Sequence, residues 1–136
     1  MQKGKIYNKD FVIWVEEQAS ALKKRQFNQL DFDNLIEEIE DMGKSEKRSL
    51  ESYLERLIEH ILKVEYWEAE RANNYQHWNT EIKNFRNRID RLLKRSPSLK
   101  RYMVEIYPEL FADVVDAWSD RFDFPKDLIP LEKILK

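Results

Sequence analysis

The sequence lacks cysteine altogether and contains very little glycine or proline. Its 136 residues include no Cys, two Gly and four Pro. Without Cys the chain can form no disulfide and carry out no thiol chemistry, which fits a reducing compartment. Gly and Pro dominate tight turns, so their scarcity argues against many short strands and favours long helices.

Long apolar runs and an excess of one charge are missing as well. No stretch approaches the roughly 20 apolar residues of a membrane-spanning helix, and the opening residues MQKGKIYNKD contain no apolar signal core. With 24 Lys and Arg against 26 Asp and Glu, the formal net charge is −2, so no overall field attracts nucleic acid or an acidic membrane. We therefore expect a cytoplasmic protein without a membrane partner, and nucleic acid is not the expected partner.

What the chain has in abundance is apolar and charged residues at helical spacing. Hydrophobic residues make up 42% and charged residues 37%, which suffices for one core in a single domain over residues 1–136. The strictest apolar stripe is Tyr75, Trp78, Ile82, Phe85, Ile89 and Leu92. We predict an all-α fold, a single helical bundle of four to five principal helices plus a short C-terminal helix. The residues expected to be largely buried are Trp14, Leu57, Trp78, Phe85 and Ile89.

Capping residues and helix breakers indicate where the helices begin and end. The predicted boundaries are Asn8 as the first N-cap, Asp31 or Asp33 as the next, a turn at residues 72–74, Ser96 as an N-cap followed by Pro97, a kink or break at Pro108, and a final turn of helix begun by Pro130.

Gly43 leaves two interpretations of the second helix open. The 3–4 spacing of apolar residues continues from Ile36 and Ile39 to Trp67 without a slip, which predicts one helix over about residues 33–67. In that helix Ile36 and Ile39 point to the core, and Gly43 allows the close approach of a neighbour. Alternatively, Gly43 ends one helix as a C′ residue and Ser45 caps another.

Two segments concentrate charge of one sign. Residues 34–46, NLIEEIEDMGKSE, are mostly acidic, and residues 83–101 contain eight Lys and Arg against Asp90 alone. The acids are interpreted as a solvated helix face or as a site that needs negative charge. The bases either pair with carboxylates of neighbouring helices or form a ridge that follows phosphates. That ridge would consist of Arg88, Arg91 and Arg95.

The two histidines suggest different chemistry. His60 lies in the apolar stripe, where a buried neutral ring and a catalytic ring are both conceivable. Metal binding is not expected, since neither His has the Glu-x-x-His or His-x-x-x-His spacing. Arg71 and His77, in RANNYQH, resemble the Arg and His of the helical-bundle ribonucleases called HEPN. That resemblance implies a pair acting on the 2′-OH and the scissile phosphate of RNA.

Most of the chain resembles one known family. The segments that carry the resemblance are DFVIWVEEQASALKKRQFNQLD, LDFDNLIEEIEDMGKSEKRSLESYLERLIEHILK, SPSL and the FP…P tail, with Trp78 and Arg86 between them. The chain is similar to the bacterial family catalogued as domain of unknown function 29. The resemblance implies a small all-helical protein without an established activity, cofactor or substrate. His77 stands where relatives are expected to have Ser or Asn, which counts against the ribonuclease interpretation.

The same pattern draws attention to polar residues that packing alone does not require. They are Gln18, Asn34, Glu37, Glu40, Ser45, His60 and Arg86. Among them, Glu37 or Glu40 with His60, Arg86 and Gln18 are expected to form either a buried network that fixes the register of the helices or an open site.

Two hypotheses for function follow. The first is a non-enzymatic interaction protein without a cofactor, which binds a protein partner or itself, as a possible homodimer. It would use aromatic and acidic surface near the first two helices. The alternative is a ribonuclease or nucleic-acid binder that uses Arg71, His77 and the basic segment 83–101.

Overall fold

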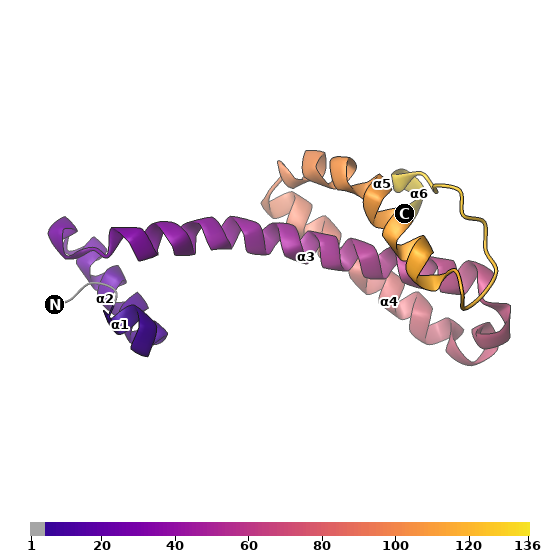
Figure 1. Ribbon diagram of the computed structural model, residues 1–136, viewed down its shortest axis with the longest axis horizontal. Helices are drawn as coiled ribbons and strands as arrows, with labels where there is room; N and C mark the ends of the chain where they lie inside the picture. The colour runs from indigo at the N-terminus through magenta and orange to yellow at the C-terminus, as the bar shows by residue number, and fades with distance from the viewer. Residues whose placement is uncertain (1–4) are drawn as a thin grey trace. The chain divides into compact units, whose positions relative to one another are not determined.

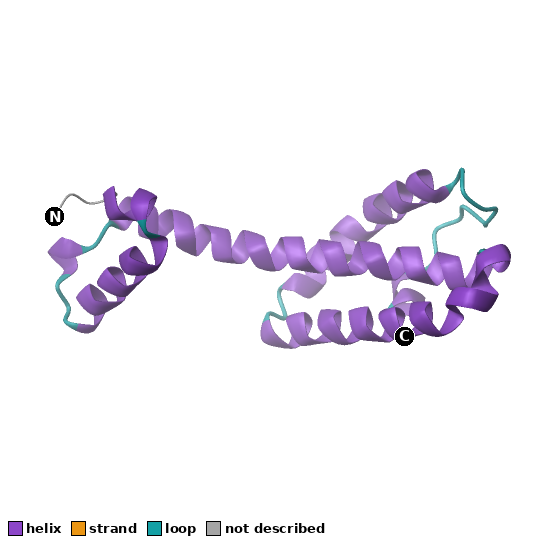
Figure 2. Cartoon of the chain, turned by 90° about the horizontal axis from the view of Figure 1, so that it is seen from below, coloured by secondary structure: helices purple, strands orange, loops and turns teal. Residues whose placement is uncertain are grey.

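The computed structural model describes residues 5–136, and this part of the chain consists of helices and loops without a strand (Figure 1, Figure 2). The elements are α1 (Lys5–Lys9), α2 (Phe11–Lys23), the 3₁₀ helix η1 (Phe27–Gln29), α3 (Phe32–Tyr66), α4 (Glu68–Arg95), α5 (Leu99–Trp118) and α6 (Leu131–Ile134). The all-α prediction is confirmed.

The chain divides into two compact units, residues 1–45 and residues 46–136. We call them the N-terminal unit and the C-terminal unit and describe each by itself. A single domain over the whole chain stays a prediction.

The C-terminal unit contains the main hydrophobic core. The last part of α3, together with α4, α5 and α6, contributes to it, and the chain reverses between α3 and α4 at one residue, Trp67 (Figure 1). The fully buried members include Leu57, Ile89 and Met103. The predicted burial of Leu57, Trp78, Phe85 and Ile89 is confirmed.

The predicted turn at residues 72–74 is wrong, because α4 already begins at Glu68 and passes through them. The Asn74 side-chain nitrogen donates to the Glu70 carbonyl at 2.9 Å, within the helix. The reversal lies earlier, where the Trp67 ring stacks on Phe122 at 5.0 Å and on Trp78 at 6.1 Å between ring centroids. Aromatic packing therefore outweighs the weak helix propensity of Asn.

The helix boundaries that were predicted at serine and proline residues of the C-terminal unit are only partly confirmed. Ser96 ends α4, where its backbone N–H donates to the Leu92 carbonyl at 2.8 Å, and α5 starts later, at Leu99. Helix α5 continues through Pro108 without a break, and Figure 1 shows its axis changing direction partway along. Pro130 immediately precedes α6, as predicted.

The N-terminal unit has a small core. Its buried side chains are Trp14, Ala21 and Leu30, together with the polar Gln18 and Asp31. Burial of Trp14 is confirmed. The predicted cap at Asn8 is wrong, because Asn8 lies inside α1 and Asp10 caps α2 by accepting the Ile13 N–H at 3.1 Å.

Helix α3 runs through Gly43, so the two-helix interpretation is wrong. The expected close neighbour is absent too, since no described atom beyond the adjacent residues and the local backbone of α3 comes within 4 Å of a Cβ placed on Gly43. Ile36 and Ile39 were expected in the core, but they are 53% and 63% exposed.

Candidate functional site

Exposed apolar side chains are concentrated in the N-terminal unit. Ten of the thirteen large hydrophobic residues that are exposed in the described chain lie there, and they are Phe11, Val12, Ile13, Val15, Leu22, Phe27, Phe32, Ile36, Ile39 and Met42. A few scattered apolar residues on a surface need no explanation, but a concentration of this kind marks an interaction site or an aggregation liability.

The most regular part of this surface lies on α3. Phe32, Ile36 and Ile39 follow each other at the 4-3 spacing of a helix face, and Met42 comes one turn after Ile39. Their exposed fractions are 53%, 53%, 63% and 66%. We call these four residues the α3 stripe.

A row of acids runs beside the α3 stripe. Asp33, Glu37 and Glu40 each follow a stripe residue by one position, so they share the same 4-3 spacing on one flank of the helix. All three are exposed. None of them takes part in the three ion pairs found among residues 5–136. We call these three residues the acidic flank.

A buried polar network holds α2 against the start of α3. One Asp31 carboxylate oxygen accepts the Trp14 indole N–H at 3.0 Å and an Asn34 side-chain N–H at 2.8 Å. The Asp31 backbone N–H donates to the Gln18 side-chain oxygen at 2.8 Å. The structure thus joins two residues of the predicted polar cluster, Gln18 and Asn34, through Asp31.

Sequence reasoning had treated Asp31 as a possible helix cap only. Nothing in the residue type distinguishes a buried acid from a capping acid, because both stand just before a helix. The available signal was the combination of an Asp before α3 with a Trp and a Gln four residues apart on α2, which is the spacing of one helix face.

Aromatic contacts extend this corner of the N-terminal unit. The Tyr7 ring lies 4.8 Å from the Trp14 ring, and Phe11 stacks on Trp14 at 5.7 Å between centroids. The Tyr7 hydroxyl donates to the Glu38 carboxylate of α3. This hydrogen bond and the neighbouring negative charge raise the pKa of Tyr7 to about 12.

Other members of the predicted polar cluster take no part in the hydrogen bonds of this network. Glu37, Glu40 and Ser45 are exposed residues of α3 in the N-terminal unit. His60 and Arg86 belong to the C-terminal unit. The His60 ring forms a hydrogen bond with the Arg56 carbonyl oxygen, and the Arg86 guanidinium donates one to the Ile134 carbonyl oxygen.

His60 is half-buried beside Phe85, with 5.5 Å between the ring centroids. Its Nδ1 lies 2.7 Å from the Arg56 carbonyl oxygen, so the neutral ring carries its proton on Nδ1. Desolvation lowers the pKa of His60 below its ordinary value of 6.5, although the Arg56 carbonyl acts in the opposite direction. The neutral ring is therefore the form that the fold favours.

The structure does not assemble Arg71 and His77 into a catalytic pair. Both lie on α4, where six residues correspond to about 600° of rotation and about 9 Å of rise, so they leave the helix on different sides. One Arg71 terminal nitrogen donates to the Glu65 carbonyl at 2.7 Å. His77 is exposed.

Neighbouring helices neutralise little of the basic segment. In residues 83–101, Lys94 pairs with Asp90 on its own helix at 2.9 Å, and Arg101 pairs with Glu105 at 3.6 Å on α5. Arg95 and Glu46, 4.0 Å apart, form the one pair between helices found in the described chain. Arg88 instead lies over the Tyr53 ring, at 5.6 Å from its centroid. The expected interhelical ion pairs are therefore largely absent.

No three His, Asp or Glu side chains within residues 5–136 come together as they would around a metal ion. None of the described helices combines the length and the apolar character needed to cross a membrane.

These features define an all-helical protein with an uncovered apolar face beside an acidic row, and without an assembled catalytic group among the residues considered above. Residues 6–136 match the family described as Domain of unknown function DUF29. The chain belongs to this family. No curated protein and no solved structure matches the chain significantly.

Proposed function

We propose that the protein is a non-enzymatic interaction module whose α3 stripe binds an amphipathic helix of a partner protein. The observation that supports this most directly is the exposure of Phe32, Ile36, Ile39 and Met42 at helical spacing. A partner helix that lays its own apolar face on such a stripe removes both surfaces from water. Full burial of a Phe, Ile or Met side chain contributes roughly 1.5–3 kcal/mol.

The acidic flank indicates the chemistry of that partner. In paired helices, charged residues beside the apolar seam select partners of opposite charge. Asp33, Glu37 and Glu40 would therefore face Lys or Arg on the bound helix. A second copy of the chain fits less well in a symmetric pairing, because two such flanks would bring like charges together.

The test uses two synthetic peptides that form amphipathic helices. Both carry leucine on one face, and the other face carries lysine in the first peptide and glutamate in the second. We expect the lysine peptide to bind with about tenfold higher affinity, because each of the three acids of the flank attracts lysine and repels glutamate by a few tenths of a kcal/mol. Fluorescence anisotropy of labelled peptides measures both dissociation constants.

Variants locate the binding surface. Ile36→Ser combined with Ile39→Ser should weaken binding of the lysine peptide about tenfold or more, since two apolar contacts are lost. The matched control is Val104→Ser, which changes an apolar residue of α5 that is 56% exposed, and it should leave the affinity unchanged. Glu37→Gln with Glu40→Gln should reduce the preference for lysine over glutamate.

Three results would overturn this proposal. One is equal binding of the two peptides. Another is a loss of affinity in Val104→Ser as large as that in the stripe variant. The third is a concentration-dependent dimer in light scattering that Ile39→Ser abolishes, since the occupant of the stripe would then be a second copy.

A second candidate function is binding of single-stranded nucleic acid. It depends on Arg88, Arg91 and Arg95, which are all exposed. Among the ion pairs of the described residues, only Arg95 is paired with an acid of another helix. If this candidate holds, labelled single-stranded RNA binds with an affinity that falls steeply with salt, and Arg91→Gln weakens it. RNA should stay intact in the presence of a chelator. Cleavage that His77→Ala abolishes without loss of the fold would restore the ribonuclease interpretation.

A further inference from the structure

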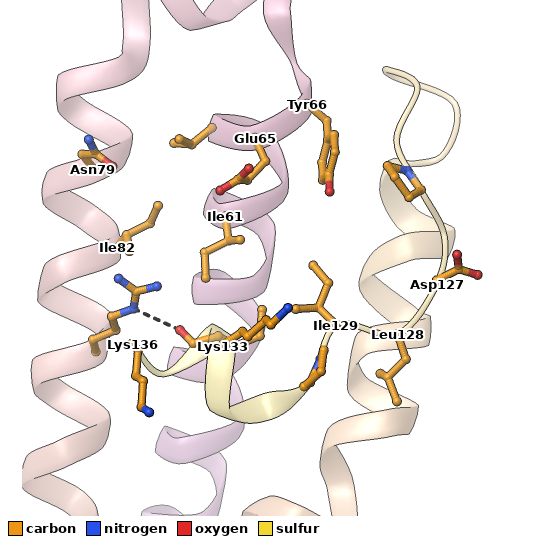
Figure 3. Close-up of a pocket in the computed structure, with 15 residues that line it drawn as sticks. Ile61, Glu65, Tyr66, Asn79, Ile82, Asp127, Leu128, Ile129, Lys133 and Lys136 are labelled. Atoms are coloured by element: carbon orange, nitrogen blue, oxygen red, sulfur yellow. Dashed lines mark hydrogen bonds between the residues drawn. The ribbon is translucent and has the colours of Figure 1, made fainter.

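The C-terminal unit contains a cleft of about 670 Å³. Its walls come from α3, α4 and the C-terminal segment 125–136. Figure 3 shows Ile61 of α3 and Ile82 of α4 on one side and Ile129 and Lys133 of the C-terminal segment on the other. The volume falls within the range of about 300–1,000 Å³ that is usual for small-molecule sites.

Arg86 supplies a cation to this cleft. It is half-buried, and its Nε donates to the Ile134 carbonyl at 3.0 Å, the dashed line in Figure 3. Within the described residues, neither of its terminal nitrogens forms a hydrogen bond, and none of the three ion pairs includes Arg86. Asp90, one turn further along α4, pairs with Lys94 instead.

A guanidinium in this position lacks the carboxylate that usually compensates its loss of water. Burial already disfavours its charged form, which lowers the pKa of Arg86. The hydrogen bond from Nε to the Ile134 carbonyl fixes the plane of the guanidinium. The two terminal nitrogens are then left to donate to another acceptor. Lys133 and Lys136 add two further cations to the lining of the cleft.

We propose that this cleft binds a small organic molecule with an apolar body and one carboxylate. The carboxylate accepts hydrogen bonds from the terminal nitrogens of Arg86, a geometry that arginine forms well. The apolar body lies against Ile61, Ile82 and Ile129. Glu65 and Asp127 also line the cleft and disfavour a second negative charge on the ligand, so a monocarboxylate is expected instead of a dicarboxylate.

The experiment compares octanoate with octanamide, which has the same apolar body and no charge. Isothermal titration calorimetry on the full chain should show octanoate binding at least about tenfold more tightly, as loss of a charged hydrogen bond predicts. Suberate, with a carboxylate at each end, should bind more weakly than octanoate.

Two variants on α4 distinguish binding of octanoate in the cleft from a nonspecific attraction of octanoate to positively charged side chains. Arg86→Gln should weaken octanoate binding about tenfold or more, whereas Arg88→Gln removes an exposed cation outside the cleft and should have no effect. Because Arg86→Gln also removes a contact to α6, its helical content is checked by circular dichroism. Lys133→Gln, an exposed substitution, should weaken octanoate binding while the fold is intact.

Failure of octanoate to bind overturns the proposal, as does equal binding of octanoate and octanamide. A peptide with apolar last residues and a free C-terminus provides the other source of the same chemistry. If it binds more than about tenfold more tightly than octanoate, the small-molecule assignment is wrong. The N-terminal variants described above do not touch this cleft, so the two proposals can fail independently.

Discussion

Asp31 connects the two helices α2 and α3 of the N-terminal unit. Its carboxylate accepts from Trp14 on α2 and from Asn34 on α3, and its backbone N–H donates to Gln18. A carboxylate that is only 5% exposed remains favourable in a fold when donors surround it. Asp31 is therefore the residue through which Trp14 and Gln18 of α2 and Asn34 of α3 are joined by hydrogen bonds.

Replacing Asp31 by Ala should destabilise the N-terminal unit by about 2–3 kcal/mol, because the buried Trp14 indole N–H loses its acceptor. Urea denaturation monitored by the NMR signal of that indole proton measures the change. The control is Asp41→Ala, an exposed acid on α3, which should alter stability by no more than about 0.5 kcal/mol. Equal effects of the two substitutions would contradict the role of Asp31.

His60 should make stability depend on pH. Since its pKa is lowered in the fold, the unfolded chain takes up a proton near pH 6.5 while the folded chain takes it up only at lower pH. The free energy of unfolding is therefore fully retained above the unfolded pKa and decreases as the pH falls from 6.5 through the folded pKa of His60.

Urea midpoints on either side of this window, at about pH 7.5 and about pH 5, should differ more in the unmodified chain than in His60→Gln. The matched variant His77→Gln removes an exposed imidazole of α4 and should keep the difference. An NMR titration that places the pKa of His60 at or above 6.5 would show that desolvation does not dominate there.

At the scale of elements, sequence periodicity predicted helices well and their surroundings poorly. The unbroken 3–4 spacing predicted that α3 passes through Gly43, which the structure confirms. The same spacing placed Ile36 and Ile39 in the core, and both are exposed. A periodic pattern identifies the apolar face of a helix, but it contains no information on which other segment covers that face.

Gly43 lies in an exposed part of α3 where a methyl group meets no neighbour. Gly43→Ala should therefore stabilise the helix by up to about 1 kcal/mol, the difference in helix propensity between the two residues. Ser45→Ala, two residues later, should give a smaller gain of about 0.5 kcal/mol. Denaturant unfolding measures both, and a loss of stability in Gly43→Ala would contradict the open surroundings of Gly43.

The candidate sites show the same division between local and distant information. Gln18, Asn34 and Arg86 could be singled out from the sequence because they are polar residues that packing of the helices alone does not require. Asp31 was assigned a local role only. The cleft around Arg86 needs residues 125–136 to pack against α3 and α4, and contacts between segments far apart in the sequence leave no local pattern to detect.

At the scale of the whole molecule, burial is distributed unevenly. The main core comprises fourteen buried residues, from Leu50 to Ile134, all in the C-terminal unit. The described residues of the N-terminal unit bury three apolar side chains and two polar ones. Chains of about 40 residues rarely bury enough apolar surface to be stable without further support. The N-terminal unit should therefore open more easily than the C-terminal unit, and a bound partner helix would stabilise it.

Hydrogen exchange on the full chain tests this difference. Amides of α2 should exchange faster than those of α4 and α5, because local opening of the N-terminal unit exposes few apolar side chains. The lysine peptide should slow exchange in α2 and at the start of α3 and leave α5 unchanged.

A fragment of residues 46–136 should remain helical and unfold cooperatively, since its core is complete without the preceding residues. Uniform exchange rates across both units, or a fragment without helical structure, would show that the two units are stable only together.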